Sequence, residues 1–249
     1  MTEAGPDRLA HYLLRNVNKA NRLYRLFDAG DRIAVAVSGG KDSATLLELL
    51  RRWRGPFLLD LVAVHVVPAG SPCGEMIAPE ELRQWLDGLG VETAVVPAEE
   101  ASGRPRRARQ GPCFHCAWRR RKAIFLTAQR LGCNKVALGH HADDVAVTTL
   151  LNLVYQGRCE TMPPRISLFG GRLTLIRPLY LIEERRIAQF AQSGVFPFVP
   201  KTCGRGEDSR RARMKEILRL LHEENPRVRR CLMNAVEAVG AFGYREGER

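Results

Sequence analysis

The sequence predicts an α/β protein built on a parallel five-stranded sheet flanked by helices, with a helical C-terminal part. Short apolar runs alternate with longer segments of helical periodicity along most of the chain. The first run, Arg32–Ser38, is apolar almost throughout, as expected of a strand buried on both faces. Because strand, helix and strand recur in this order, right-handed crossovers and a parallel sheet are favoured. The 249 residues, 45% of them hydrophobic, are enough for one large domain.

Each expected strand is a short apolar run that ends near a loop. The five strands are Arg32–Ser38, Asp60–Val67, Val91–Ala98, Lys135–His140 and Arg172–Leu179. The expected helices are Asp42–Trp53, Ala78–Gly90, Trp118–Leu131, Asp143–Tyr155, Glu183–Gln192 and Ser209–Ala238, the last broken at Pro226. We expect three segments: an N-terminal helical segment (1–30), the sheet domain with a CxxC insertion (31–200), and a helical C-terminal segment with a further cysteine (201–249).

The charge balance points to a polyanionic partner. The formal net charge is +12, and the basic residues cluster as well as outnumber the acidic ones. No apolar run has the length of a membrane span, and the first residues lack the apolar core of a secretory leader. We therefore expect a cytoplasmic protein with no membrane partner, whose seven cysteines are reduced thiols or metal ligands.

The hexapeptide SGGKDS leaves the first strand and opens the first helix of the sheet domain. Two glycines let the backbone approach an anion, and the helix N-terminus adds unpaired N–H groups. Asp42 suits a Mg²⁺ ion that bridges to phosphate. A Walker loop needs four residues before its GK, so this is no P-loop; a turn capped by serine is the structural alternative. The candidate nucleotide residues are Ser38, Gly39, Gly40, Lys41, Asp42 and Ser43.

A second polar segment, ALGHHADD (Ala137–Asp144), ends the fourth strand. In a parallel sheet the loops after Val37, Val67 and Leu138 share the carboxyl edge, where ligands bind. Gly139 belongs to this segment, and Asp143 and Asp144 could cap the next helix or bind a cation. His65 ends the second strand and either lines an adenosine pocket or is simply packed there.

A CxxC pair, Cys113 and Cys116, precedes the basic run Arg119–Lys122. Neighbouring arginines favour thiolate over thiol. A zinc half-site and a redox dithiol are alternatives, although zinc usually takes a fourth protein ligand and His115 is poorly placed to be it.

Together these motifs resemble the tRNA 2-thiocytidine synthetases (TtcA family) of the PP-loop, or N-type ATP pyrophosphatase, superfamily. The resemblance runs from about Leu9 to Val239 and adds CETMPPRIS (Cys159–Ser167), IRPL (Ile176–Leu179) and a late cysteine in VPKTCGRGEDSRRARMKEIL. It implies ATP, Mg²⁺ and a [4Fe–4S] cluster held by Cys113, Cys116 and Cys203 with one iron free. The implied catalytic residues are Lys41, Asp42, Asp144, Cys113 and Cys203.

The implied reaction is ATP-dependent thiolation of a cytidine at position 32 in the tRNA anticodon loop, with sulfur from a cysteine desulfurase or another donor. Family precedent implies a homodimer. Alternatives are thiolation of another tRNA base, a ligase of the lysidine type, a non-catalytic RNA-binding module and a redox dithiol protein. Cys73, Cys133, Cys159 and Cys231 stand alone, and Pro200 replaces a second late cysteine of the family pattern. The candidate tRNA contacts are Arg119, Arg120, Arg121, Lys122, Arg210 and Arg211.

Overall fold

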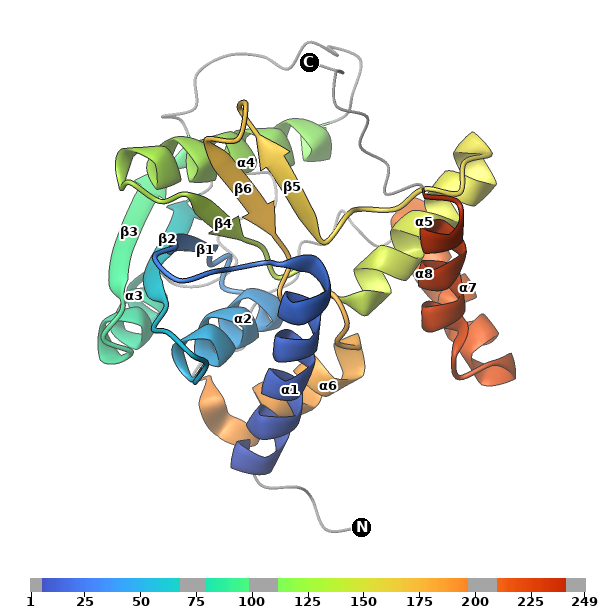
Figure 1. Cartoon of the computed structure of the whole chain (residues 1–249), viewed down its shortest axis with the longest axis horizontal. Coiled ribbons are helices and arrows are strands. Elements are labelled where there is room, and N and C mark those ends of the chain that lie inside the picture. The colour runs from blue at the N-terminus through green and yellow to red at the C-terminus, as the bar shows by residue number, and fades with distance from the viewer. Residues whose placement is uncertain (1–5, 68–78, 99–111, 197–209, 241–249) are drawn as a thin grey trace.

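A computed structural model describes residues 6–67, 79–98, 112–196 and 210–240 (Figure 1). Its described part contains one six-stranded sheet in the order β3-β2-β1-β4-β6-β5. All neighbouring strands are parallel except the β5–β6 pair. The strands are β1 (Arg32–Ala36), β2 (Asp60–Val67), β3 (Glu92–Pro97), β4 (Lys135–Ala137), β5 (Arg165–Leu168) and β6 (Leu173–Ile176).

The fold class is as predicted, but the sheet has one strand more than the five expected. The extra strand, β5, pairs antiparallel with β6 at the edge of the sheet. Its four residues alternate between exposed and half-buried, so no apolar run marks them in the sequence. Only the inner partner, β6, is buried throughout and was recognisable as a strand.

Helices cover both faces of the sheet; of the helices that the structure describes, α4 covers one face and α1, α2, α3 and α6 cover the other (Figure 1). In β1, Ile33 and Val35 join the core under α1 and α2, while Ala34 and Ala36 join the core under α4. This alternation is why β1 reads as a continuous apolar run. The helical elements are α1 (Pro6–Tyr24), α2 (Lys41–Arg51), α3 (Pro79–Gly88), α4 (Pro112–Arg130), α5 (Ala142–Gln156), α6 (Glu184–Phe190), the π-helical turn η2 (Ala191–Val195), α7 (Arg210–Glu224) and α8 (Val228–Ala238).

Helix α4 begins earlier than the sequence pattern predicts. It starts at Pro112 rather than near Trp118, so the CxxC pair lies in its first turns instead of in a preceding loop. Proline is well suited to the first helical position because the N–H it lacks would have no partner there. The predicted break at Pro226 is confirmed, since α7 ends at Glu224 and α8 begins at Val228.

The strand order places the site. β1 lies between β2 and β4, and the chain moves outward through β2 and β3 before returning to the other side of β1. In such sheets this reversal marks the ligand-binding crevice, which lies beyond the carboxyl ends of the strands, here β1 and β4. The loops that enter it are the two polar segments of the sequence, one after β1 and one after β4.

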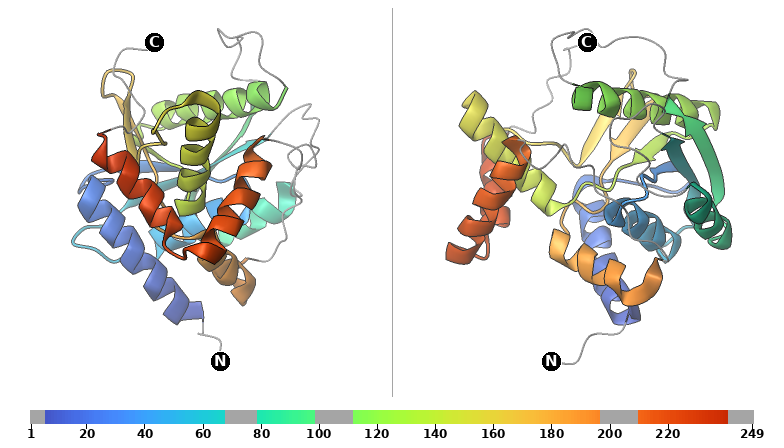
Figure 2. Two further views of the ribbon diagram at one scale, coloured as in Figure 1. Left: turned by 90° about the vertical axis from the view of Figure 1, so that its right-hand side faces the viewer. Right: turned by 180° about the vertical axis from the view of Figure 1, so that it is seen from behind.

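The C-terminal helices α7 and α8 lie near this crevice because they pack against α5. Its residues Ala146, Val147 and Leu150 form a small buried core with Met214 and Leu218 of α7. Figure 2 shows α7 and α8 packed beside α5, away from the sheet. No helix within the described ranges is both long enough and apolar enough to cross a membrane.

A buried ion pair joins β1 to β4 at the opposite edge of the sheet. The Lys135 side chain is 5% exposed, and its Nζ lies 2.5 Å from Oδ2 of Asp31. Asp31 also accepts hydrogen bonds from the side chain of Asn134 and the backbone N–H of Asp28. Both oxygens of the Asp31 carboxylate therefore have partners, and Lys135 neutralises the buried negative charge.

Lys135→Met should lower the free energy of unfolding by about 3 kcal/mol or more, because it leaves the Asp31 carboxylate buried without its cation. Urea unfolding followed by circular dichroism measures this. Arg219→Gln, which removes an exposed ion-paired arginine of α7, serves as the control and should leave stability nearly unchanged. Equal effects of the two substitutions would contradict this account of Lys135.

Candidate functional site

The loop between β1 and α2 is held by its own two serines. Ser43 Oγ donates to the carbonyl of Gly40 at 2.9 Å and accepts the backbone N–H of Ser38 at 3.1 Å. The Ser38 hydroxyl therefore donates to Ser43 Oγ, 3.1 Å away, and accepts from Gly40 N–H at 3.3 Å. Gly39 has φ +83, a left-handed conformation that favours glycine. The serines thus shape the loop, and the backbone N–H groups of the α2 N-terminus and Lys41 remain as anion ligands.

Gly139 packs directly against this loop. A Cβ atom at Gly139 would lie 3.0 Å from the carbonyl carbon of Asp42 and 3.1 Å from the backbone nitrogen of Ser43. These are backbone atoms at the start of a helix, so they cannot move aside as a side chain would. The loop after β4 approaches the start of α2 this closely because residue 139 has no side chain.

Lys41 is shared between two carboxylates. Its Nζ lies 2.9 Å from Oδ1 of Asp42 and 2.9 Å from Oε1 of Glu184, at the start of α6. Burial would raise the pKa of Glu184, but the hydrogen bond and charge of Lys41 outweigh it and lower that pKa to about 2. Burial would likewise lower the pKa of Lys41, and the two carboxylates raise it instead. Both groups are charged at neutral pH.

Asp143 and Asp144 are adjacent but have different partners. Asp144 Oδ2 accepts the backbone N–H of His141 at 3.1 Å, which caps α5, and its Oδ1 is paired with Arg211 of α7. Asp143 Oδ2 instead accepts the backbone N–H of Glu184 at 2.7 Å, and its Oδ1 lies 2.7 Å from the guanidinium of Arg229. The capping alternative therefore applies to Asp144, while Asp143 ties α5 to α6 and α8.

Two histidines stand beside these carboxylates. His141 is 2% exposed; its Nε2 lies 3.4 Å from Oδ2 of Asp144 and 3.8 Å from Oδ1 of Asp42, and its buried Nδ1 has no hydrogen-bond partner. His140 Nδ1 accepts a hydrogen bond from Nε of Arg177 at 3.3 Å. Burial and the Arg177 charge lower the pKa of His140 to about 4, so its ring is neutral at pH 7. Burial lowers the pKa of Arg177 to about 10.

His65 lies on the other side of the loop. Its Nδ1 is 2.7 Å from the carbonyl oxygen of Val37, and because a carbonyl can only accept, Nδ1 carries the proton. Burial lowers the pKa of His65, and the charge of Arg120 lowers it further. The ring supports the entry to the SGGKDS loop, with Nε2 left as an acceptor. The loop after Val67 falls outside the described residues.

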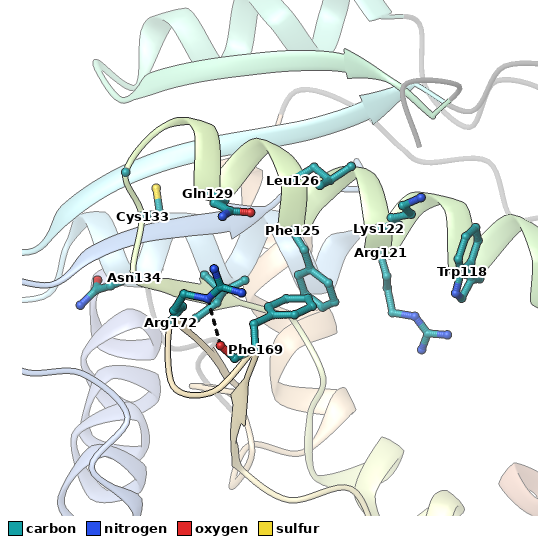
Figure 3. A pocket seen from close by; sticks show the side chains of 12 residues that line it. Trp118, Arg121, Lys122, Phe125, Leu126, Gln129, Cys133, Asn134, Phe169 and Arg172 are labelled. Carbon is teal, nitrogen blue, oxygen red and sulfur yellow. Dashed lines mark hydrogen bonds between the residues drawn. The ribbon is translucent and has the colours of Figure 1, made fainter. Parts of the chain in front are cut away.

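The predicted tRNA contacts on α4 divide between two surfaces. Arg120 and Arg121 act electrostatically on His65 and Arg177, at the edge of the sheet that bears the loops. Arg121 and Lys122 also line a surface groove of about 700 Å³ between α4 and the β5–β6 turn (Figure 3). In it the rings of Phe125 and Phe169 approach edge to face, 6.2 Å apart. Arg119 is exposed.

The C-terminal candidates also differ from each other. The guanidinium of Arg210 lies over the ring of Tyr155, 4.7 Å from its centre, whereas Arg211 pairs with Asp144. In the sequence Arg229 stands in a basic cluster with Arg227 and Arg230, a pattern typical of a solvated face. Instead its side chain is 17% exposed and bound to Asp143.

Five of the seven cysteines lie within the residues that the structure describes. Cys113 and Cys116 lie three residues apart in the first turns of α4, and Cys116 is half-buried. Cys203 and Cys73 lie outside the described residues. Cys133 is buried, Cys159 is half-buried and Cys231 is exposed. Within the described ranges no three side chains of the ligating types gather as a metal site.

Sequence reasoning missed Glu184, Arg177 and His141 as members of the site. Arg177 lies within the motif IRPL, and His141 lies within ALGHHADD. Glu184 follows IRPL by a few residues. A carboxylate at the start of a helix that follows the last parallel strand was the available signal for Glu184. Its partner, Lys41, lies 143 residues away, so the pairing itself has no sequence signature.

A glycine-rich loop that faces an acidic loop across the crevice is typical of a PP-loop domain. The sequence model of the PP-loop domain family matches residues 13–221. The tRNA-cytidine(32) 2-sulfurtransferase of Geobacter metallireducens is 41% identical over 230 residues, which cover 90% of this chain and 88% of that protein. That of Anaeromyxobacter dehalogenans strain 2CP-C is 39% identical over 237 residues, 93% and 80% of the two chains. The chain belongs to this family of PP-loop tRNA sulfurtransferases, as the sequence motifs predicted.

A solved structure agrees in fold. The U34-tRNA thiolase NcsA from Methanococcus maripaludis, determined with its [4Fe-4S] cluster, superimposes with a TM-score of 0.80. The superposition covers 97% of this chain and 82% of the NcsA chain, and the two sequences are 20% identical. The likeness establishes a shared fold over nearly the whole chain.

Gly139→Ala should weaken ATP binding at least about tenfold, because the new methyl group must displace the backbone of Asp42 and Ser43. Equilibrium dialysis with labelled ATP measures the dissociation constant. Gly88→Ala, at a position where a Cβ meets nothing within 4 Å, is the matched control and should bind ATP normally. Normal binding by Gly139→Ala would show that the loop contact is not needed for the nucleotide.

The depressed pKa of His140 predicts a pH-dependent stability. The unfolded chain binds the proton below pH 6.5 and the folded chain only below about 4, so stability falls as pH drops through this window. The loss cannot exceed about 3.5 kcal/mol, since the pKa falls from 6.5 to about 4 and each pKa unit is worth about 1.4 kcal/mol. Urea unfolding between pH 7 and 4 should give a shallower decline for His140→Gln than for the wild type. Parallel curves would exclude His140 as the cause.

Proposed function

We propose that this protein thiolates cytidine 32 of tRNA in two steps, adenylation by ATP and replacement of the activated oxygen by sulfur. The observation that carries the proposal is the meeting of the SGGKDS loop and the Gly139 loop at the switch point of the sheet. It creates an anion-binding helix N-terminus beside a group of carboxylates, which suits a nucleotide with its divalent cation. The sulfurtransferase relatives, at about 40% identity over most of the chain, support the substrate.

In the first step the C2 carbonyl oxygen of the cytosine attacks the α-phosphorus of ATP. An oxygen–phosphorus bond forms, the bond to the β-phosphate oxygen breaks, and pyrophosphate leaves. Lys41 and the N–H groups at the start of α2 are placed to hold the phosphates and to stabilise their growing charge. In the empty site Lys41 is held by Asp42 and Glu184, so it must exchange part of this pairing for the phosphates.

The acidic residues fit a divalent cation. Asp42 and Asp144 both approach the same nitrogen of His141, so their carboxylates lie close together. Carboxylate oxygens are the ligands that Mg²⁺ takes alongside substrate phosphates. We infer that Asp42 and Asp144 hold Mg²⁺ in the nucleotide complex. Asp143, enclosed by Glu184 and Arg229, supports the loop instead.

In the second step a sulfur nucleophile attacks C2 of the adenylated base, the C2–O bond breaks, and AMP departs with the oxygen. We assign Cys113, Cys116 and Cys203 as ligands of a [4Fe–4S] cluster. A cluster with three thiolate ligands supplies an iron without a protein ligand, at which sulfur can be held. The donor set fits: two cysteines share the first turns of α4, where the positive end of the helix and the following arginines favour thiolates.

The anticodon loop suits this site because its bases are unpaired and can be turned into a crevice. We propose that tRNA phosphates are bound by five basic residues, Arg119, Arg120, Arg121 and Lys122 of α4 and Arg210 of α7. A desulfurase-derived sulfur supply and a homodimer stay predictions, as does the cytoplasmic location.

The assignment is tested by deleting the gene and restoring it with wild type or Cys116→Ser, then measuring thionucleosides in tRNA by mass spectrometry. Deletion should remove 2-thiocytidine alone, and Cys116→Ser should not restore it. The purified variant should also contain far less iron than the wild type. Cys231→Ser, at an exposed position, should restore 2-thiocytidine and keep the iron.

Loss of a different thionucleoside would retain the mechanism and replace the base. If no thionucleoside changes, the thiolation proposal fails. If 2-thiocytidine is lost but iron in Cys116→Ser equals that of the wild type, the cluster assignment fails.

A further inference from the structure

The nucleotide site is charge-balanced by residues from helices far apart in the chain. Among the described residues, its four carboxylates, Asp42, Asp143, Asp144 and Glu184, each have a basic partner. Lys41 comes from the loop itself, but the other partners come from the C-terminal helices: Arg211 and Lys215 from α7, and Arg229 from α8. ATP adds several negative charges here, so these partners must reorganise when it binds.

The two arginine pairs are not equivalent. Arg229 is 17% exposed and Asp143 9%, and Asp143 also accepts the backbone N–H of Glu184. Arg211 is 41% exposed and binds Oδ1 of Asp144 through one nitrogen, whereas Arg229 binds Oδ1 of Asp143 through two. Breaking the first pair would leave two buried charges, whereas Arg211 stays solvated when it turns away from Asp144, which is 15% exposed. Arg229 is therefore a fixed anchor, and Arg211 is the exchangeable partner.

Arg211 also lies within reach of the nucleotide. Asp144 Oδ2 and Asp42 Oδ1 lie 3.4 and 3.8 Å from the same His141 nitrogen, so Asp144 adjoins the SGGKDS loop. The charge of Arg211 contributes to the lowered pKa values of both Asp144 and His140, so it lies near both. The α7 backbone is held by Met214 and Leu218 against α5, so the side chain can move while the helix stays.

We propose that Arg211 is an exchangeable counter-ion: it pairs with Asp144 in the empty site and binds the ATP phosphates when the nucleotide enters. A guanidinium suits both partners, because its planar donors bind carboxylate and phosphate alike. After the exchange, Asp144 is free to accept a divalent cation. The inference rests on the ATP binding of the proposed function and adds a phosphate ligand from the C-terminal helices.

The test is a double-mutant cycle on ATP affinity in metal-free buffer without tRNA, with wild type, Arg211→Gln, Asp144→Asn and the double variant. Arg211→Gln alone is ambiguous, since an unpaired Asp144 would itself repel ATP. In the Asp144→Asn background that repulsion is absent. There Arg211→Gln should still weaken ATP binding about tenfold or more, because the lost bond is to phosphate.

A change of threefold or less in that background would overturn the proposal, because it would mean that Arg211 acts only through Asp144. Arg211→Lys in the same background keeps the charge and should lose less affinity than Arg211→Gln; an equal loss would also count against a phosphate contact. Arg219→Gln, on the same helix but paired with Glu216 and Glu223, is the control and should bind ATP like the wild type. Thermal unfolding of each variant verifies that it is folded.

The outcome separates this inference from the proposed function. If the wild type binds no ATP, the proposed function fails and the inference fails with it. If the wild type binds ATP and makes 2-thiocytidine while Arg211→Gln has no effect in the Asp144→Asn background, only the inference fails.

Discussion

The backbone contact between Gly139 and the start of α2 is the constraint on which the site depends. Two loops from neighbouring parallel strands meet there with no side chain between them. Because of that contact, the carboxylates after β4 stand beside the lysine and aspartate after β1. A Cβ at residue 139 would press on the backbone of Asp42 and Ser43 and shift the two loops relative to each other, although both loops could still form.

Ion pairs between the carboxylates of the site and nearby basic side chains stabilise this arrangement of loops. Carboxylates this close together would repel one another and raise their own pKa values if they were alone. Lys41 lowers the pKa of Glu184, and His141 and Arg211 lower that of Asp144, despite the burial of both carboxylates. The empty site is thus internally compensated, and a nucleotide must replace some of its ion pairs rather than fill a vacant positive pocket.

The C-terminal helices are therefore part of the nucleotide site and not an appendage to it. Helix α5 begins at the site, and its apolar side forms a core with α7 and α8. These helices then direct arginines back toward the first turn of α5. The order of the chain suits the proposed chemistry, since α4 carries two of the proposed sulfur-site cysteines and the segment before α7 carries the third.

The sequence by itself determined the fold class, the two loops of the crevice and the family. Those features are local: a strand buried on both faces is an apolar run, and a phosphate-binding turn needs glycines and a lysine at fixed spacing. It missed β5, because an edge strand of four partly exposed residues has no apolar run, and it misplaced the start of α4, where a proline opens the helix.

Only the tertiary structure decided which charges meet. Glu184 lies 143 residues from Lys41, Arg211 is 67 from Asp144 and Arg229 is 86 from Asp143. No periodicity connects such positions, and in the sequence Arg211 and Arg229 are members of ordinary basic clusters. The packing of α7 and α8 against α5 brings them to the site, because side chains so far apart in the chain can only be paired by the fold that encloses them.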